Sequence, residues 1–140
     1  MDDFIIARSD GSPTYNLTVV VDDNDMNISH VIRGEDHISN TPKQMLIYKA
    51  LEWTIPKFGH LPMILGSDGK RLSKRHGAKG TGEYKDLGYL PDTLINYLAL
   101  LGWNPGNDDE IFDFNYLKEN FSLDKVNKKS AVFDTTKLEW

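Results

Sequence analysis

The most informative segment of this sequence is Lys70–Lys79, which reads KRLSKRHGAK. Five of these residues are Lys or Arg, and none is acidic. Positive charge of this density is expected to meet anionic oxygens and favours a polyphosphate ligand, although a solvated surface loop or a nucleic-acid patch carries similar charge. Glycines in and around the segment predict a loop that bends easily; they are Gly66, Gly69, Gly77, Gly80 and Gly82.

The composition restricts the class of protein. The 140 residues are 39% hydrophobic with a net charge of -5, which suits one medium domain, or part of a larger one with a small second domain. An acidic chain is a poor general nucleic-acid coat, because sequence-independent affinity comes from Lys and Arg on phosphates. The chain has no cysteine, so no disulfide or thiolate metal site is available. No apolar run approaches about 20 residues, so we expect a soluble protein with no membrane partner.

The first half of the chain alternates apolar runs with turn signals. Apolar runs predict strands over residues 4–8, 28–33 and 58–65. A helix is predicted to begin near Thr41, with Thr41 as its cap, Pro42 at its first position and Gln44 completing a capping box. The apolar stripe that follows is expected to be core rather than site; its members are Met45, Ile47, Tyr48 and Leu51.

The second half of the chain has a helical pattern. A helix is predicted from Pro91 to Leu101 with Gly102 as its stop. Residues 104–109 form a turn-rich acidic link, and shorter helices are predicted over 115–121 and 123–127. We therefore expect the chain from about residue 86 onward to be a small helical domain.

The basic loop is accompanied by other recognisable segments. Arg71–Arg75 (RLSKR) resembles the KMSKS signature of class I aminoacyl-tRNA synthetases, in the form that glutamyl-tRNA synthetases carry. The resemblance extends over almost the whole chain, to PTYNL at 13–17, VVDD at 20–23, HVIRGED at 30–36, GHLP at 59–62 and NYLALLGW at 96–103. The sequence is thus similar to an internal part of a bacterial-type glutamyl-tRNA synthetase.

The resemblance implies an α/β fold with two parts. Residues 1–85 would form the C-terminal half of a class I synthetase Rossmann-type catalytic domain, and residues 86–140 the start of a small all-α stem-contact domain. It also places a helix over residues 15–23, where the β-branched run would favour a strand by propensity alone.

The resemblance assigns catalytic and ATP-binding roles. Lys74 would steady the departing pyrophosphate, with Arg71 in support and Ser73 shaping the loop or donating a hydrogen bond. Asp36 and the backbone near Ile64 would contact ATP, which is expected as a substrate with Mg2+ and without a protein-bound metal. His37 stands where the family often has an aromatic residue, which leaves the contact of Asp36 with ATP open.

Two residues are predicted to bind glutamate. Arg33 could pair with Glu35 or Asp36, but the resemblance favours its planar fork holding the side-chain carboxylate of the substrate. Glutamate is therefore favoured over glutamine. Tyr15 is by default a half-buried packing residue, whereas the family position directs its hydroxyl to the bound glutamate. The adjacent acids at 22–23 point apart on a helix or strand and are expected to be structural.

The expected function follows from the resemblance. The chain would be part of a cytoplasmic glutamate-tRNA ligase, with glutamate, ATP and tRNA(Glu) as partners and a monomeric parent. No HIGH-type signature occurs in it, so we expect an excised fragment that is inactive alone and self-associates through exposed apolar surface. The alternatives are a non-catalytic nucleotide- or tRNA-binding module and a relative of the glutamyl-queuosine tRNA synthetases.

Overall fold

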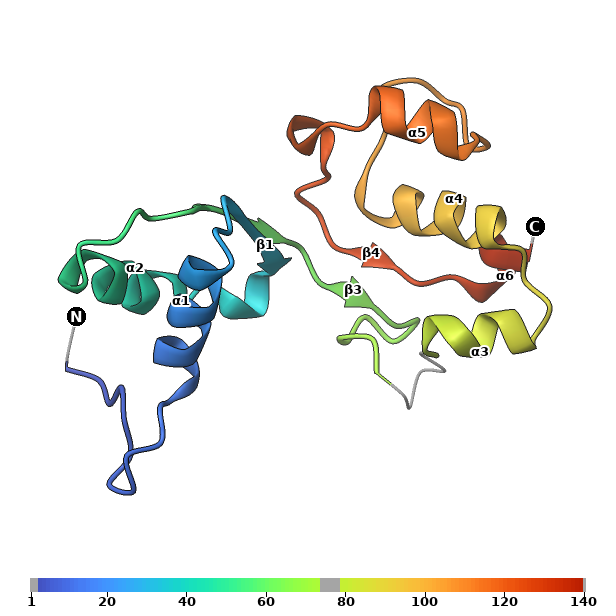
Figure 1. The fold of residues 1–140 in the computed structure, drawn as a ribbon. Coiled ribbons are helices and arrows are strands. Elements are labelled where there is room, and N and C mark those ends of the chain that lie inside the picture. The colour runs from blue at the N-terminus through green and yellow to red at the C-terminus, as the bar shows by residue number, and fades with distance from the viewer. Residues whose placement is uncertain (1–2, 74–78, 140) are drawn as a thin grey trace. The chain divides into compact units, whose positions relative to one another are not determined.

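The structure is a computed structural model and describes residues 3–73 and 79–139 (Figure 1). Lys74, the predicted pyrophosphate-binding residue, lies outside the described residues. The chain divides into two compact units, unit 1 (Met1–His60) and unit 2 (Leu61–Trp140). The predicted α/β class is confirmed, and the strands of the described residues pair as two two-stranded sheets, β1 (His30–Gly34) with β2 (Lys57–Leu61) and β3 (Ile64–Leu65) with β4 (Ala131–Val132).

Unit 1 is built on two helices that pack together. Its elements are α1 (Tyr15–Asp25), β1 (His30–Gly34), the 3-10 turn η1 (Glu35–His37), α2 (Thr41–Ala50) and most of β2 (Lys57–Leu61). Val20 of α1 is 1% exposed and packs with Ile47 and Tyr48 of α2. The predicted helix after residue 14 is therefore confirmed, because this burial outweighs the strand propensity of the valine run.

The start of α2 differs from the prediction. The N-cap residue is Asn40, and Thr41 and Pro42 already lie inside the helix. Gln44 does not complete a capping box. Its side chain is buried and turns into unit 1, where it hydrogen-bonds Arg33 and Asn16. The capping-box prediction was therefore wrong, because a buried polar partner competes for the amide.

Two of the strand predictions also need correction. Residues 4–8 form no strand, and among the described residues their only β-type pairing is the isolated bridge between Ala7 and Pro13. The run over 58–65 is divided into β2 and β3 (Ile64–Leu65). Pro62 lies between them, and it has no N–H to donate to a strand ladder.

Unit 2 is organised around α4 (Pro91–Gly102), which packs against α5 (Phe114–Asn120), α6 (Thr135–Glu139) and β4 (Ala131–Val132) (Figure 1). The other elements are α3 (Thr81–Asp86) and the 3-10 turn η3 (Leu123–Lys125). β4 pairs in parallel with β3, Ile64 opposite Ala131. The region expected to be all-helical thus contributes one short strand.

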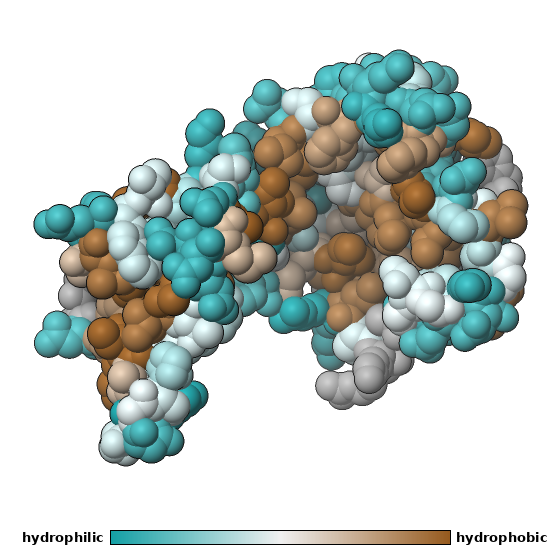
Figure 2. Space-filling view, viewed as in Figure 1, coloured by the Kyte–Doolittle hydropathy of each residue, from teal (hydrophilic) through white to brown (hydrophobic). Residues whose placement is uncertain are grey.

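The core of unit 2 consists of two aromatic clusters on either side of α4. One contains Tyr84, Tyr97, Leu101 and Leu138, and the other Trp103, Phe112 and Leu117. The exposed surface of the unit remains partly apolar, as the brown areas in Figure 2 show; large exposed side chains include Ile111, Phe114, Phe121 and Leu123. Within the described part of the chain, no helix combines the length and the apolar composition that crossing a bilayer requires.

Candidate functional site

Arg33 occupies the end of β1 in unit 1 and is held on several sides. Its Nη2 donates to Oε1 of Gln44 at 2.7 Å and to Oγ1 of Thr41 at 2.9 Å. Its Cζ lies 5.4 Å from the centre of the Phe58 ring on β2, within the range of a cation–π contact. Both hydrogen-bond acceptors are neutral, so these contacts orient the guanidinium without cancelling its charge.

A polar network spreads outward from Arg33. Gln44 donates through Nε2 to Oδ1 of Asn16 at 3.1 Å, which connects α2 to the first turn of α1. Thr41 Oγ1 lies 2.9 Å from Nε2 of His60 on β2. Nε of Arg33 is buried and has no hydrogen-bond partner among the described residues. The described residues therefore do not use all the hydrogen-bond donors of Arg33.

The positive charge of Arg33 affects two ionisable neighbours. Burial lowers the pKa of His60, and the charges of Arg33 and His37 lower it further, so the neutral imidazole is favoured. Burial raises the pKa of Asp23 on α1, while Arg33 pulls that pKa down. Asp23, which was predicted to be structural, is thus part of the electrostatic surroundings of Arg33.

Tyr15 begins α1 and approaches the same cluster. Its hydroxyl lies 3.3 Å from Nδ1 of His37, and the two rings are 5.8 Å apart at a tilt of 40°. Thr41 Oγ1 donates to the backbone carbonyl of His37 at 3.4 Å. The structure therefore brings Tyr15 and Arg33, the two residues predicted to bind glutamate, into one network through His37 and Thr41.

Asp36 lies on η1, directly after β1. A Cβ atom built on Gly34 would be 2.5 Å from Oδ1 of Asp36, so the carboxylate folds back over this glycine and no other residue fits there without a shift. A side chain at position 34 would therefore require the carboxylate of Asp36 to turn away from its place over the end of β1.

The basic loop begins in unit 2 as a tight hairpin. Leu72 donates its N–H to the carbonyl of Ile64 at 2.8 Å, and Gly66 donates to the carbonyl of Lys70 at 2.7 Å. Gly69 turns the chain with φ +73°, a conformation that other residues adopt only with strain. The hairpin thus carries Ile64 and Arg71, which were predicted to bind ATP, and leads to Ser73, which was predicted to be catalytic; Arg71 is exposed and Ser73 is half-buried.

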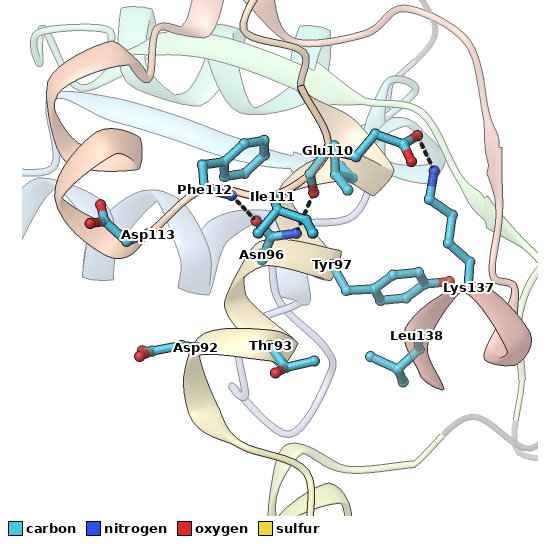
Figure 3. A pocket seen from close by; sticks show the side chains of 11 residues that line it. Asp92, Thr93, Asn96, Tyr97, Glu110, Ile111, Phe112, Asp113, Lys137 and Leu138 are labelled. Atoms are coloured by element: carbon cyan, nitrogen blue, oxygen red, sulfur yellow. Dashed lines mark hydrogen bonds and ion pairs between the residues drawn. The ribbon is translucent and has the colours of Figure 1, made fainter. Parts of the chain in front are cut away.

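Unit 2 also contains a cavity of about 400 Å³ beside α4 (Figure 3). Several of the polar groups that line it are engaged within the chain. Asn96 donates to the carbonyl of Glu110 and accepts from the N–H of Phe112, both at 2.8 Å. Lys137 pairs with Glu110, and the hydroxyl of Tyr97 bonds both backbone groups of Asp134. This cavity is therefore a weaker candidate than the Arg33 network.

No cluster of three or more His, Cys, Asp or Glu residues that could hold a metal ion occurs over residues 3–73 and 79–139. A cation that accompanies a nucleotide would instead be held largely by phosphate oxygens, which are the ligands that Mg2+ commonly shares with a few protein groups. The described donor set in unit 1 is suited to an anion, because it consists of a guanidinium with neutral hydroxyl, amide and imidazole groups around it.

Sequence reasoning missed four members of the network: Asn16, Thr41, Gln44 and His60. Thr41 and Gln44 were read as the start of a helix, and GHLP at 59–62 served only as part of a resemblance. A signal for Gln44 was present, since it occupies a position between the apolar residues of α2 and is therefore directed toward the core.

Comparisons with known proteins agree on one family. The family of class I tRNA synthetases (E and Q), catalytic domain, matches residues 1–140. The chain is 60% identical over 140 residues to a glutamate-tRNA ligase from Vesicomyosocius okutanii and 58% identical over 138 residues to one from Desulforamulus reducens. These matches cover 100% and 99% of the chain.

A solved structure of a protein from the same family has a similar fold. The crystal structure of a glutamate tRNA ligase from Elizabethkingia meningosepticum in complex with its amino acid matches with a TM-score of 0.88 and 36% identity, over 100% of this chain and 32% of that one. The chain spans 30% and 29% of the length of the two curated relatives.

Proposed function

This chain belongs to the class I tRNA synthetases for glutamate and glutamine, and we propose that it is part of a glutamate-tRNA ligase. In that reaction the α-carboxylate of glutamate attacks the α-phosphate of ATP and pyrophosphate leaves. The resulting glutamyl-adenylate then passes its acyl group to a ribose hydroxyl of tRNA(Glu). Little covalent chemistry is required of the protein in the first step, so positioning and charge stabilisation supply the rate.

The observation that carries this proposal is the arrangement of Arg33. Gln44 and Thr41 orient its guanidinium, and the face of Phe58 supports it. Both hydrogens of Nη2 are engaged by Gln44 and Thr41, so the positive charge and the other donors of the guanidinium would bind the carboxylate of glutamate, and the neutral amide of glutamine would lack the charge attraction. Tyr15 would add its hydroxyl from the start of α1.

The basic loop would supply positive charge for the leaving group. Lys74 would contact the pyrophosphate oxygens, Arg71 and Ser73 would support it, and Ile64 and Asp36 would contact ATP. Mg2+ would arrive with ATP and neutralise part of the phosphate charge. The hairpin closed by Leu72 and Gly69 supports this assignment, because it anchors one end of the loop to β3.

The remaining parts of the proposal concern organisation. Residues 1–85 would belong to the catalytic domain and residues 86–140 to a stem-contact domain that meets tRNA, which the helical content of α4, α5 and α6 supports. The protein would act in the cytoplasm, and its natural form would be a monomer. The 140 residues alone would self-associate through exposed apolar side chains such as Phe114 and Phe121.

The test is aminoacylation by the protein that carries this sequence, at its natural length, with glutamate and with glutamine. Arg33→Met should raise the KM for glutamate by about 10- to 100-fold, because charge-assisted hydrogen bonds are lost, and should leave the KM for ATP nearly unchanged. Lys49→Met is the matched control, since Lys49 is an exposed cation on α2 in the same unit. An unchanged KM for glutamate in Arg33→Met would refute the assignment.

A further inference from the structure

Gln44 is the most deeply buried polar side chain in the described part of the chain. It is 1% exposed and lies on α2 beside the core residues Ile47 and Tyr48. An amide removed from water destabilises the fold unless its hydrogen bonds are replaced. A purely structural position here would be filled better by an apolar side chain, so the amide calls for another explanation.

The orientation of the Gln44 amide follows from its partners. Arginine can only donate hydrogen bonds, so the group 2.7 Å from Nη2 of Arg33 must be the carbonyl oxygen Oε1. The NH2 group is then directed to Oδ1 of Asn16, 3.1 Å away. Asn16 directly follows Tyr15 in α1. One amide therefore connects Arg33 to the turn of helix that carries Tyr15.

We propose that Gln44 is a positioning residue that fixes the guanidinium of Arg33 relative to the start of α1 and thereby sets the preference for a substrate carboxylate over an amide. This inference rests on the proposed function, in which Arg33 binds the side chain of glutamate. Gln44 itself does not touch the substrate. It acts through Arg33 and, by way of Asn16, through the helix end at Tyr15.

The neutrality of Gln44 matters as much as its geometry. A carboxylate in the same place would form an ion pair with Arg33, and the charge of Arg33 would then be less available to a second carboxylate. Thr41, the other acceptor for Nη2, is neutral as well. Two neutral acceptors orient the guanidinium while its positive charge remains available for the ligand.

The experiment uses four variants of the natural-length protein, Gln44→Met, Gln44→Glu, Arg33→Met and the double variant Arg33→Met/Gln44→Met. Tyr48→Phe serves as control, because Tyr48 is buried on the same helix and loses only a hydroxyl that has no hydrogen-bond partner among the described residues. For each protein the KM for glutamate, glutamine and ATP and the kcat are measured in ATP–pyrophosphate exchange with tRNA present.

Gln44→Met is expected to raise the KM for glutamate about tenfold, with the KM for ATP and the kcat nearly unchanged. In the Arg33→Met background the same change should have no further effect on that KM, because the residue through which Gln44 acts is gone. Gln44→Glu keeps the size of the side chain and should reduce the glutamate-to-glutamine ratio of kcat/KM by about tenfold or more. Tyr48→Phe should change none of these quantities.

Three results would overturn the inference. In the first, Gln44→Met changes the kcat and all three KM values alike. In the second, Gln44→Met still raises the KM for glutamate when Arg33 is already methionine. In the third, Arg33→Met raises the KM for glutamate while both Gln44 variants leave that KM and the selectivity unchanged; the proposed function then stands without the positioning role. If Arg33→Met itself has no effect, the proposed function fails, and the inference fails with it.

Discussion

Tyr97 connects α4 to the C-terminal helix of unit 2, and Tyr97→Phe tests that connection. Its hydroxyl donates to the carbonyl of Asp134 at 2.8 Å and accepts from the N–H of the same residue at 2.7 Å. Asp134 in turn accepts from the N–H groups of Thr136 and Lys137 and so caps α6. The hydroxyl thus holds the residue on which the last helix begins.

The cost of the substitution can be estimated from these contacts. Two hydrogen bonds are lost, each contributing about 1 kcal/mol to the free energy of unfolding. The aromatic ring remains, so its edge-on contact with Phe133, at 5.3 Å and 87°, is kept. Asp134 is exposed, and water can partly replace the lost partner. We therefore expect Tyr97→Phe to destabilise unit 2 by about 1–2 kcal/mol.

Tyr48→Phe is the matched control in unit 1. Tyr48 is 2% exposed, and its hydroxyl has no hydrogen-bond partner among the described residues. Removing a buried hydroxyl that makes no hydrogen bond should leave the stability within about 0.5 kcal/mol or increase it. The same chemical change is thus predicted to have different effects in the two units.

Urea denaturation gives the free energy of unfolding, and amide hydrogen exchange shows which segment responds. In Tyr97→Phe, exchange should accelerate over residues 131–139 and remain unchanged in α1 and α2. Equal effects of the two substitutions on the free energy of unfolding would refute the reasoning. So would a loss of protection confined to unit 1.

Three further predictions concern the loop, the hairpin and the pH dependence. Lys74→Ala should lower the kcat of ATP–pyrophosphate exchange by about 100-fold with little change in the KM for glutamate, whereas Lys79→Ala at the other end of the loop should have little effect. Gly69→Ala should destabilise the hairpin by about 1 kcal/mol, because alanine is strained at φ +73°. The loss should be seen as faster hydrogen exchange of the Leu72 amide. Gly82→Ala is the control and should stabilise α3, because alanine favours a helix and a Cβ atom there meets no other atom. Folding lowers the pKa of His60, so as the pH falls below about 6.5 the imidazole is protonated in the unfolded state before it is protonated in the folded state. The free energy of unfolding should therefore decrease as the pH falls through this range. The urea midpoint of His60→Gln should lack this part of the pH dependence, and an identical profile would contradict the assignment.

Much of the fold could be predicted from local patterns. The alternation before Gly34 placed β1, and Pro91 with Gly102 placed both ends of α4. The helix at Tyr15 required the family resemblance, because its valines favour a strand when taken alone. Packing of Val20 against α2 reverses that preference, and a tertiary contact of this kind is invisible in a local window.

The candidate site was predictable only in part. Arg33 and Tyr15 were predicted to bind glutamate, and the structure places them in one network, but the groups that connect them were not predicted. Gln44 matched a helix-start pattern, and nothing local to the sequence indicates that its amide meets Arg33, eleven residues earlier, and Asn16, on another helix. Hydrogen bonds between distant elements depend on the packing of those elements, which sequence periodicity does not specify.

The most direct test of the central claim is a crystal structure of the natural-length protein with a non-hydrolysable glutamyl-adenylate analogue. The side-chain carboxylate of the analogue should lie about 2.7–2.9 Å from the guanidinium of Arg33, with the Gln44 and Thr41 contacts to Nη2 retained. A well-defined analogue whose carboxylate meets another residue, with Arg33 directed elsewhere, would contradict the account.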